Sequence, residues 1–514
     1  MALLQSSHRV PKVVELVLAL VAVYAAFKVL TAFVQWRKRQ AFMREKGCLP
    51  APWVPSWDRI YGLDLFFKNM GHLKNHTLLE KTNRRFQETK FRTFQLVVLG
   101  RHLHQTIEPE NLKTIQAIDF KKWSLGERRK TAFHPLLGEG IFTTDGAAWQ
   151  HSREMLRPNF ARTQIGNIDT YEKHVSHLIA AIPADGQTVD LSELFFRLTI
   201  DSATEFLFGE SVETLVKGTG AGFTDAFTHS QEYIANSARW GKWAKYFPAN
   251  KRFQQDAKLV HDFVDYFVDK GLAKEKSGQS DPERYVFIDE LVSQTSDRVR
   301  IRSELLNILL AGRDTTASLL TNLWFVLAKR PDVWARLQAD VAQLGGEKPT
   351  FEQLRDLKYL RALMNESLRV HPVVPLNSRQ ATEDTTLPLG GGPDGLAPLF
   401  MPKGSIVAWS VYAMHRRKDL YGEDAEEFKP ERWLDDPVTG RKGLRTGWEF
   451  LPFNGGARIC LGQQFALTEA GYTIVRMAQT FSEIESRDPN DWQEWLTLTC
   501  TSLNGAKVAL KRRS

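Results

Sequence analysis

The sequence predicts a mainly α-helical domain with small β-sheets, an α+β fold, preceded by a single N-terminal transmembrane helix. Three observations predict this arrangement: an almost wholly apolar stretch near the N-terminus, long segments whose apolar residues recur every three and four positions, and a few short β-like runs. Of the 514 residues, 43% are hydrophobic and 25% are charged, which is ordinary globular composition. We find no repeat and no second long polar linker, so we expect one large domain.

The apolar stretch runs from Val13 to Val34 and is long enough to cross a bilayer of roughly 30 Å as a helix. No small-residue cleavage site follows it, so retention as an anchor is favoured over removal as a signal peptide. More basic residues follow the stretch than precede it; those that follow are Arg37, Lys38, Arg39, Arg44 and Lys46. The positive-inside bias therefore places the short N-terminus in the lumen and the main body in the cytosol.

A proline-rich segment follows the basic residues, with Pro50, Pro52 and Pro55 interleaved with Trp53 and Trp57. Proline fixes φ and removes a donor, so the segment is either a semi-rigid spacer that sets the pose of the body above the membrane or an ordinary loop. The predicted boundaries are a lumenal N-terminus at 1–12, an anchor at 13–35, a basic and proline-rich linker at 36–57, and the main domain at 58–514.

The helical pattern and the short β-like runs are distributed along the whole main domain. The clearest helical segments are Phe195–Phe208, Ile301–Ala328 and Phe465–Phe481, and the β-like runs are Phe91–Leu99, Ser405–Ser410 and Trp495–Leu510. The formal charge of +8 suits an acidic partner or anionic lipid, but scattered lysines explain it equally well, and we expect no nucleic-acid binding. Three cysteines are too few for a disulfide framework, which favours a reducing compartment.

One cysteine, Cys460, lies in the glycine-rich run FNGGARICLG, just before a helical pattern. The glycines permit a tight turn whose amide hydrogens can point at one sulfur, and a helix N-terminus with Arg458 nearby would stabilise a thiolate. One thiolate cannot build a tetrahedral zinc or iron–sulfur site, but it can be the axial ligand of a haem iron. From this chemistry alone, a structural loop with a buried cysteine remains equally open.

The spacing of the run is more specific than its chemistry. Phe453, Gly456, Arg458, Cys460 and Gly462 match the signature FxxGxRxCxG, and from Cys48 to the C-terminus the chain resembles the cytochrome P-450 family, with an anchor that fits its microsomal class. The resemblance implies the cytochrome P-450 fold for 58–514 and haem b, iron protoporphyrin IX, held by Cys460 as proximal metal ligand. Phe453, Gly456, Arg458 and Gly462 would contribute to cofactor binding, and Ala457 departs from the proline found in many members.

The long helical segment contains the sequence AGRDTT, an acid and a hydroxyl in an apolar stretch. By resemblance, Thr315 hydrogen-bonds the bound dioxygen, Asp314 helps to deliver protons, and small Ala311 leaves room beside the haem. The residues alone also allow a simpler interpretation, in which Thr315 bonds a carbonyl one turn earlier and Asp314 is a surface charge.

Two further motifs match the family. Glu366 and Arg369 lie three apart on one helix face, and the resemblance implies a buried structural network that they form with Arg432. Trp149 and Arg153, four apart on a helix, would bind the haem propionates; Arg379 and Arg458 match the other propionate contacts. A solvated helix face is the alternative for Arg153.

Several segments, including MHRRKDLYGEDAEEFKPERW, resemble the fungal alkane and fatty-acid hydroxylases most closely, which implies hydroxylation of a long hydrocarbon chain at or near its terminus. The segment HPVVPLNSR would then pass over the distal haem face as an apolar wall. The stretch Trp240 to Phe247 alternates basic and aromatic residues, so it is either a second membrane contact or an ordinary surface helix.

The resemblance implies a single-pass protein of the endoplasmic-reticulum membrane with a cytosolic catalytic domain and a hydrophobic small-molecule substrate. Electrons would come from NADPH–cytochrome P-450 reductase, with cytochrome b5 as an optional second partner, so NADPH and flavins act only through the partner. The alternatives are a fungal secondary-metabolite monooxygenase with a non-aliphatic substrate, a haem-thiolate isomerase or dehydratase, and a non-enzymatic membrane haem protein for electron transfer or sensing. The intact Asp314–Thr315 pair argues against the isomerase.

Overall fold

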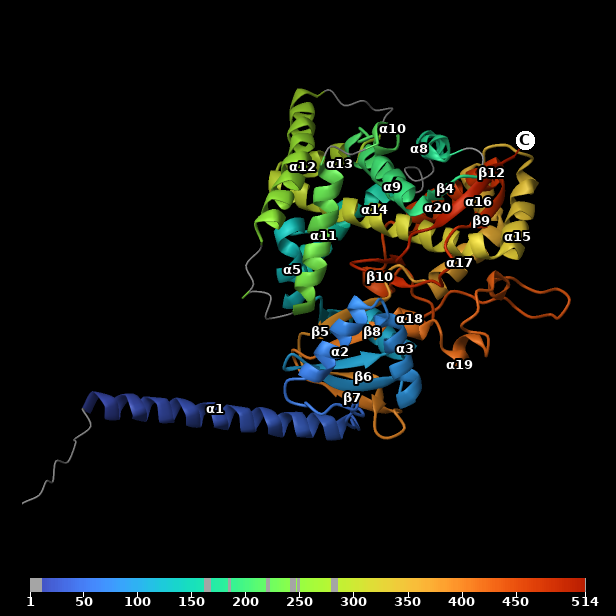
Figure 1. The fold of residues 1–514 in the computed structure, drawn as a ribbon. Coiled ribbons are helices and arrows are strands. Elements are labelled where there is room, and N and C mark those ends of the chain that lie inside the picture. The colour runs from blue at the N-terminus through green and yellow to red at the C-terminus, as the bar shows by residue number, and fades with distance from the viewer. Residues whose placement is uncertain are drawn as a thin grey trace, which may run out of the picture.

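The computed structural model describes residues 12–160, 168–183, 186–218, 222–240, 246, 250–278 and 285–513. It confirms the predicted fold class, a mainly helical domain with small sheets behind one long N-terminal helix (Figure 1). The helices are α1 (Lys12–Glu45), α2 (Leu63–Lys74), α3 (Leu78–Thr89), α4 (Pro109–Lys113), α5 (Glu127–Leu137), α6 (Gly146–Leu156), α8 (Ile168–Ala181), α9 (Leu191–Phe208), α10 (Thr214–Lys217), α11 (Phe223–Trp240), α12 (Lys251–Ser277), α13 (Phe287–Gln294), α14 (Arg298–Lys329), α15 (Pro331–Val341), α16 (Phe351–Asp356), α17 (Lys358–Val370), α18 (Val411–Met414), α19 (Lys418–Tyr421) and α20 (Gln463–Thr480).

Helix α14 is the central element of the helical part, and α9 and α20 pack against it. It begins at Asp297, whose side chain accepts the Arg300 N–H at 3.0 Å and so caps the first turn. Apolar residues surround the helix rather than forming one stripe, and Leu320 and Trp324 are fully buried in the main core. A helix that is apolar all round must be buried, and this one runs through the domain.

The strands form small sheets. They are β1 (Thr93–Val98), β2 (Arg101–Thr106), β3 (Trp123–Ser124), β4 (Thr188–Asp190), β5 (Leu376–Ala381), β6 (Thr385–Gly391), β7 (Ala397–Met401), β8 (Ile406–Ser410), β9 (Phe481–Ser486), β10 (Glu494–Leu496), β11 (Cys500–Ser502) and β12 (Lys507–Arg512). The largest sheet has the order β1-β2-β8-β5-β3, in which only β2 and β8 are parallel. The expected run Trp495–Leu510 is three strands instead of one, because turns divide it.

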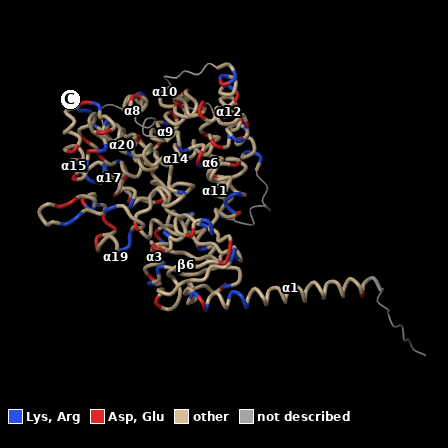
Figure 2. The backbone as a smooth tube through the Cα atoms, turned by 180° about the vertical axis from the view of Figure 1, so that it is seen from behind, with Lys and Arg blue, Asp and Glu red and all other residues tan. Residues whose placement is uncertain are grey.

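Helix α1 is longer than the predicted anchor and continues without a break through the first ten residues of the predicted linker. Its length and composition suffice to cross a membrane, and it projects away from the body with most of its basic residues at the end nearest the domain (Figure 2). At that end the Arg39 guanidinium contacts Asp384 through two 3.0 Å hydrogen bonds, and the Phe42 ring packs on Phe400. The helix is therefore attached to the β6–β7 hairpin.

The proline-rich segment is also attached to the domain by backbone hydrogen bonds. The Leu49 N–H donates to the Pro398 carbonyl at 3.0 Å, the Gly392 N–H donates to the Pro50 carbonyl at 3.0 Å, and Trp53 forms a β-bridge with Gln95. These contacts favour the spacer over the ordinary loop, because they fix the direction in which α1 leaves the body.

Large apolar side chains are exposed beside this attachment, among them Trp57, Ile60 and Phe67, with 80%, 75% and 66% of their surface accessible. The stretch Trp240 to Phe247, predicted as a possible second membrane contact, lies mostly outside the described residues. Trp240 itself ends α11, and its ring lies 5.4 Å from that of Phe66 in α2.

We predict that deleting residues 1–40 leaves a fraction of the protein bound to lipid vesicles, since the exposed apolar side chains around α2 can still enter the bilayer interface. Cosedimentation with vesicles measures the bound fraction. In the control, the same deletion also carries Trp57→Ser, Ile60→Ser and Phe67→Ser, and this protein should stay in the supernatant. Complete release of the simple deletion would show that α1 is the only membrane contact.

Candidate functional site

A cavity of about 1090 Å³ lies between α14, the loop before α20, and strands of the largest sheet. Segments that are far apart in the sequence meet around it. Of the residues predicted from the sequence, those that line it are Trp149, Arg153, Ala311, Thr315, Arg379, Phe453, Arg458, Cys460 and Gly462. Asp314 and Gly456 do not line it, and the Glu366, Arg369 and Arg432 group lies elsewhere.

The loop that carries Cys460 is held by its own backbone and by a distant segment. The Cys460 N–H donates to the Phe453 carbonyl at 3.0 Å, which closes the turn. Gly456 has a φ of 60°, and a Cβ at this position would lie 2.0 Å from the Gln116 carbonyl oxygen. The Gln116 side chain in turn accepts the Gly455 N–H at 2.8 Å. Only glycine permits this approach, which fixes the loop in place.

The Cys460 sulfur faces the cavity but is surrounded by protein. Burial raises the pKa of the thiol, and a hydrogen bond from the Gly462 amide and the charge of Arg153 lower it only in part. The sequence suggests that the loop and Arg458 would stabilise the thiolate, but the nearby charge belongs to Arg153, and Arg458 binds Asp145 instead. A metal ion on the sulfur would supply the missing positive charge, because a coordinating thiol is deprotonated.

A cluster of arginines lines the cavity near the cysteine loop: Arg129, Arg379 and Arg458. Burial lowers the pKa of Arg379 to about 9 and that of Arg129 and Arg458 to about 10, and neighbouring arginines add to the shift at Arg379 and Arg458. The Asp145 carboxylate partly opposes the shift in all three. Asp145 is the carboxylate of the group and accepts from Arg458 at 2.7 Å. The Nε atoms of Arg129 and Arg458 have no partner among the described residues.

Trp149 and Arg153 belong to the same wall. The Trp149 ring lies 4.4 Å from the guanidinium of Arg458 and 5.7 Å from that of Arg153, which donates to the Ile459 carbonyl at 3.0 Å. The chain thus offers a sulfur and an excess of buried positive charge with unused donors. Among the described residues no group of three or more His, Cys, Asp or Glu side chains could hold a metal. These residues fit a group that brings its other metal ligands and its own carboxylates, as haem does.

On α14, neighbouring residues point in different directions. The Thr315 hydroxyl lines the cavity and donates to the Ala311 carbonyl at 2.7 Å, the contact that the residues alone predict. Asp314 is buried and turned away from the cavity, where Arg313 donates to it at 3.1 Å and the side chain of Gln231 lies nearby. Burial raises the pKa of Asp314 despite these partners, so it is not a surface charge.

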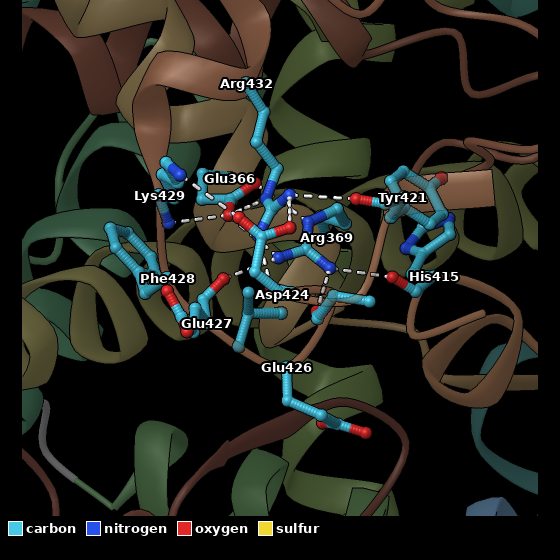
Figure 3. Close-up of polar contacts among 12 residues, drawn as sticks. Glu366, Arg369, His415, Tyr421, Asp424, Glu426, Glu427, Phe428, Lys429 and Arg432 are labelled. Atoms are coloured by element: carbon cyan, nitrogen blue, oxygen red, sulfur yellow. Dashed lines mark hydrogen bonds and ion pairs between the residues drawn. The ribbon is translucent and has the colours of Figure 1, made fainter. Parts of the chain in front are cut away.

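The Glu366–Arg369 pair is fully buried and belongs to a network with Arg432 (Figure 3). Arg369 binds both carboxylate oxygens of Glu366 at 2.8 Å, and Arg432 approaches the same carboxylate at 3.4 Å. Glu366 also accepts from the Trp433 indole at 3.0 Å and from the Lys429 N–H at 2.7 Å. The three predicted residues are therefore in one network.

The rest of the network ties the segment 415–432 together. Arg369 donates to the carbonyls of His415, Ala425 and Glu427 at 2.6–2.8 Å. Arg432 donates to the Tyr421 carbonyl at 2.9 Å and to the Asp424 carboxylate at 2.5 Å. Because this network lines no part of the cavity, it supports the site without touching a bound group.

Three residues of the site are missed by the sequence analysis: Arg129, Asp145 and Glu469. Arg129 stands in a basic run, and Asp145 only precedes α6, so neither belongs to a recognisable motif. Glu469 is buried on α20, where Ser202 donates to its carboxylate, Thr316 lies nearby, and burial raises its pKa to about 7. A glutamate nine residues after Cys460, on the apolar face of the predicted helix, is the signal that could have found it.

Comparisons with known proteins agree with this geometry. A family described as "Cytochrome P450" matches residues 64–506. The chain is 48% identical to the cytochrome P450 monooxygenase himC of Aspergillus japonicus over 476 residues, covering 91% of this chain and 84% of the relative. It is 45% identical to cytochrome P450 52A12 of Debaryomyces hansenii, covering 87% and 89%. The crystal structure of the cytochrome P450DA haem domain superposes with a TM-score of 0.75 at 21% identity, covering 91% of this chain and 97% of that one, and shows the same fold.

We predict that Arg369→Met destabilises the protein by about 3–5 kcal/mol, because it leaves the Glu366 carboxylate buried without its partner. Arg84→Met, which removes an exposed pair with Glu80, should cost under about 1 kcal/mol. Urea unfolding followed by tryptophan fluorescence measures both. Equal destabilisation by the two variants would show that the buried network is not needed for stability.

We predict that Glu469→Gln stabilises the protein above pH 7. The folded-state pKa of Glu469, about 7, lies above the usual value of 4.5, so the folded state binds the extra proton and loses stability as pH rises between these values. The amide cannot ionise, so the advantage of the variant should approach about 3 kcal/mol at high pH and vanish near pH 4.5. Thermal unfolding between pH 5 and 8 measures it; a difference that does not change with pH would contradict the assignment.

Proposed function

This chain belongs to the cytochrome P450 family and is a monooxygenase with a haem-thiolate cofactor; we propose that it hydroxylates an unactivated C–H bond of a long-chain alkane or fatty acid, at or near the terminus of the chain. The observation that carries the proposal is that Cys460 and Thr315 face one large cavity whose wall is mainly apolar. The haem, when bound, supplies the redox chemistry that inserts one oxygen atom of dioxygen into the substrate and releases the other as water, using two electrons and two protons.

The residues of this chain would bind and orient the cofactor. Cys460 would ligate the iron, with the Gly462 amide holding the sulfur in position. Arg129, Arg379 and Arg458 would bind the propionates, where their forked donors suit a carboxylate, and Trp149 and Arg153 would complete that wall. The tight turn at Gly456 and the side chain of Phe453 would hold the loop so that Cys460 lies at the cavity.

On the other wall, the Thr315 hydroxyl oxygen would accept a hydrogen bond beside the reacting atoms. Its hydroxyl hydrogen is used by the Ala311 carbonyl, which leaves the oxygen lone pairs free to accept from a donor in the cavity. The small side chain of Ala311 leaves space in the cavity beside Thr315. Asp314 would act only after turning away from Arg313, so its part in proton delivery requires a side-chain rotation.

The aliphatic substrate is supported by the apolar wall that the sequence predicts. Val373, Val374 and Leu376 line the cavity, and the segment ends at Arg379 of β5. A second candidate, a non-aliphatic substrate of a fungal secondary-metabolite pathway, is favoured by the aromatic residues of the lining, which include Phe133, Phe142 and Phe206. The two candidates differ in the skeleton of the substrate, not in the chemistry.

The partner and the location follow from the microsomal class that the sequence resembles. Electrons would come from NADPH–cytochrome P450 reductase, with cytochrome b5 as an optional second donor. The long apolar helix α1 would anchor the protein in the endoplasmic-reticulum membrane, with the domain in the cytosol.

The experiment that tests this function is a turnover screen on microsomes that contain the full-length protein and a reductase. Alkanes, fatty acids and polycyclic compounds are supplied with NADPH, and products are identified by mass. We expect terminal or near-terminal hydroxylation of the aliphatic chains. Thr315→Ala should form less product per NADPH consumed, whereas Thr315→Ser keeps the hydroxyl and should remain near wild type. Products from the polycyclic compounds alone would replace the aliphatic substrate with the second candidate.

A further inference from the structure

The cavity has a second arginine cluster, formed by Arg101, Arg128 and Arg239, which the function described above does not use. All three line the cavity. Arg101 opens β2, Arg128 lies in the first turn of α5, and Arg239 lies in the last turn of α11. The Arg128 guanidinium donates to the carbonyl of Ala238, the residue before Arg239, and the charges of Arg101 and Arg239 both act on it. Burial lowers the pKa of Arg128 to about 10, and the neighbouring charges of Arg101 and Arg239 add to this effect.

This cluster is distinct from the one near Cys460. The charges that act on Arg379 and Arg458 come from Arg129, Arg153 and Asp145, whereas those that act on Arg128 come from Arg101 and Arg239. Arg128 and Arg129 are adjacent on α5, and successive helical residues point about 100° apart, so one helix contributes to both clusters. Among the described residues, Arg153 is the charged group that lowers the pKa of the Cys460 thiol, and no arginine of the second cluster contributes to this shift.

The second cluster has no carboxylate partner among the described residues. Arg128 donates to the Ala238 carbonyl, and Arg239 donates to the Leu496 carbonyl at 2.8 Å and to the Asn236 side chain. Glu127 is the acidic residue nearest in sequence that lines the cavity, but it is exposed and contacts Lys130 at 3.5 Å. The first cluster contains Asp145; the second contains three cations and no anion.

Three guanidinium groups in one partly desolvated place repel one another, and such a group is stabilised by an anion that all of them can bind. Arg128 lines the cavity and is an exposed residue, so an anion in the cavity can reach it. The anion must therefore be small enough to enter the cavity. Guanidinium forks match the two oxygens of a carboxylate, and a few convergent polar groups in an apolar pocket usually fix the orientation of its ligand.

We propose that Arg101, Arg128 and Arg239 bind the carboxylate of the substrate, which makes the substrate a carboxylic acid rather than an alkane. The inference rests on the proposed function and refines it: an acid held at the second cluster leaves the carbons remote from its carboxylate to reach the side of Cys460 and Thr315. Reaction at or near the far end of the chain then follows from where the acid group is bound.

The test uses the full-length holoenzyme and measures dissociation constants from the shift of the haem absorption band on ligand binding. The probes are hexadecanoic acid and its methyl ester, and a polycyclic carboxylic acid and its methyl ester. We expect the acid of at least one pair to bind more tightly than its ester. Arg128→Gln and Arg239→Gln should each weaken that acid about tenfold or more, the cost of a lost charge-assisted hydrogen bond, and change its ester by less than about twofold.

Two further variants keep the test specific. Arg128→Lys keeps the positive charge and should restore part of the acid binding, and Arg252→Gln removes an exposed arginine of α12 and should change nothing. A normal thiolate-type spectrum with carbon monoxide shows that each variant is folded and holds haem. An acid preference confined to the polycyclic pair would reject the aliphatic substrate but keep this inference. Esters that bind as well as acids, acids unaffected by the variants, or no acid binding at all would overturn it.

Discussion

The buried ion pair between Glu366 and Arg369 is the interaction on which the cysteine side of the molecule depends. Two charges removed from water are tolerated only when every donor and acceptor is used, and here the extra donors of Arg369 bind carbonyls of the segment 415–427. One of these carbonyls belongs to His415, whose ring nitrogen accepts the Leu451 N–H at 3.0 Å. Burial and the adjacent charges of Arg369 and Arg416 lower the pKa of His415 to about 3, so the ring is neutral and can accept. Leu451 stands two residues before Phe453, whose carbonyl closes the turn at Cys460. Hydrogen bonds, linked by His415 and by the short backbone segment from Leu451 to Phe453, thus connect the ion pair to the cysteine loop.

The distribution of carboxylates among the buried arginines explains the division of the cavity. Arg369 and Arg432 have Glu366 and Asp424 as carboxylate partners, and the nitrogen atoms of Arg369 are all hydrogen-bonded within the protein. The group at Arg379 and Arg458 shares the single carboxylate of Asp145, and Nε atoms remain unused. The group at Arg128 has no acidic partner among the described residues. As the internal carboxylates become fewer, the groups become better suited to carboxylates that arrive from outside: the haem propionates at one group, and the acid of a substrate at the other.

The parts of the fold and site that could be predicted are those encoded by short spacings. The cysteine loop, the threonine on α14 and the Glu366–Arg369 pair each lie within a few residues of chain, where a turn or a helix face fixes the geometry. Arg129 and Asp145 escaped prediction because their roles depend on α5, the start of α6 and the cysteine loop meeting in space. The orientation of Asp314 could not be predicted from the sequence either, since Gln231, which lies beside its carboxylate, is on another helix. Likewise, apolar composition predicts where α1 can span a membrane but not that it continues to Glu45, which depends on docking at Asp384 and Phe400.

The positions of the buried acids impose a final constraint on proton movement. The two acids have different surroundings. Asp314 of α14 lies beside Arg313 and beside Gln231 of α11, whereas Glu469 of α20 accepts from Ser202 of α9 and lies near Thr316 of α14. Thr316 lines the cavity beside Thr315, so a proton from Glu469 would reach the cavity without the opening of an ion pair. A proton from Asp314 would require the contact with Arg313, at 3.1 Å, to open, because the Asp314 carboxylate faces away from the cavity. Near neutral pH Glu469 is partly protonated in place, whereas Asp314 can reach the cavity only by giving up its partners. Proton donation to the cavity would therefore be limited by pH for Glu469 and by the rotation of the side chain for Asp314.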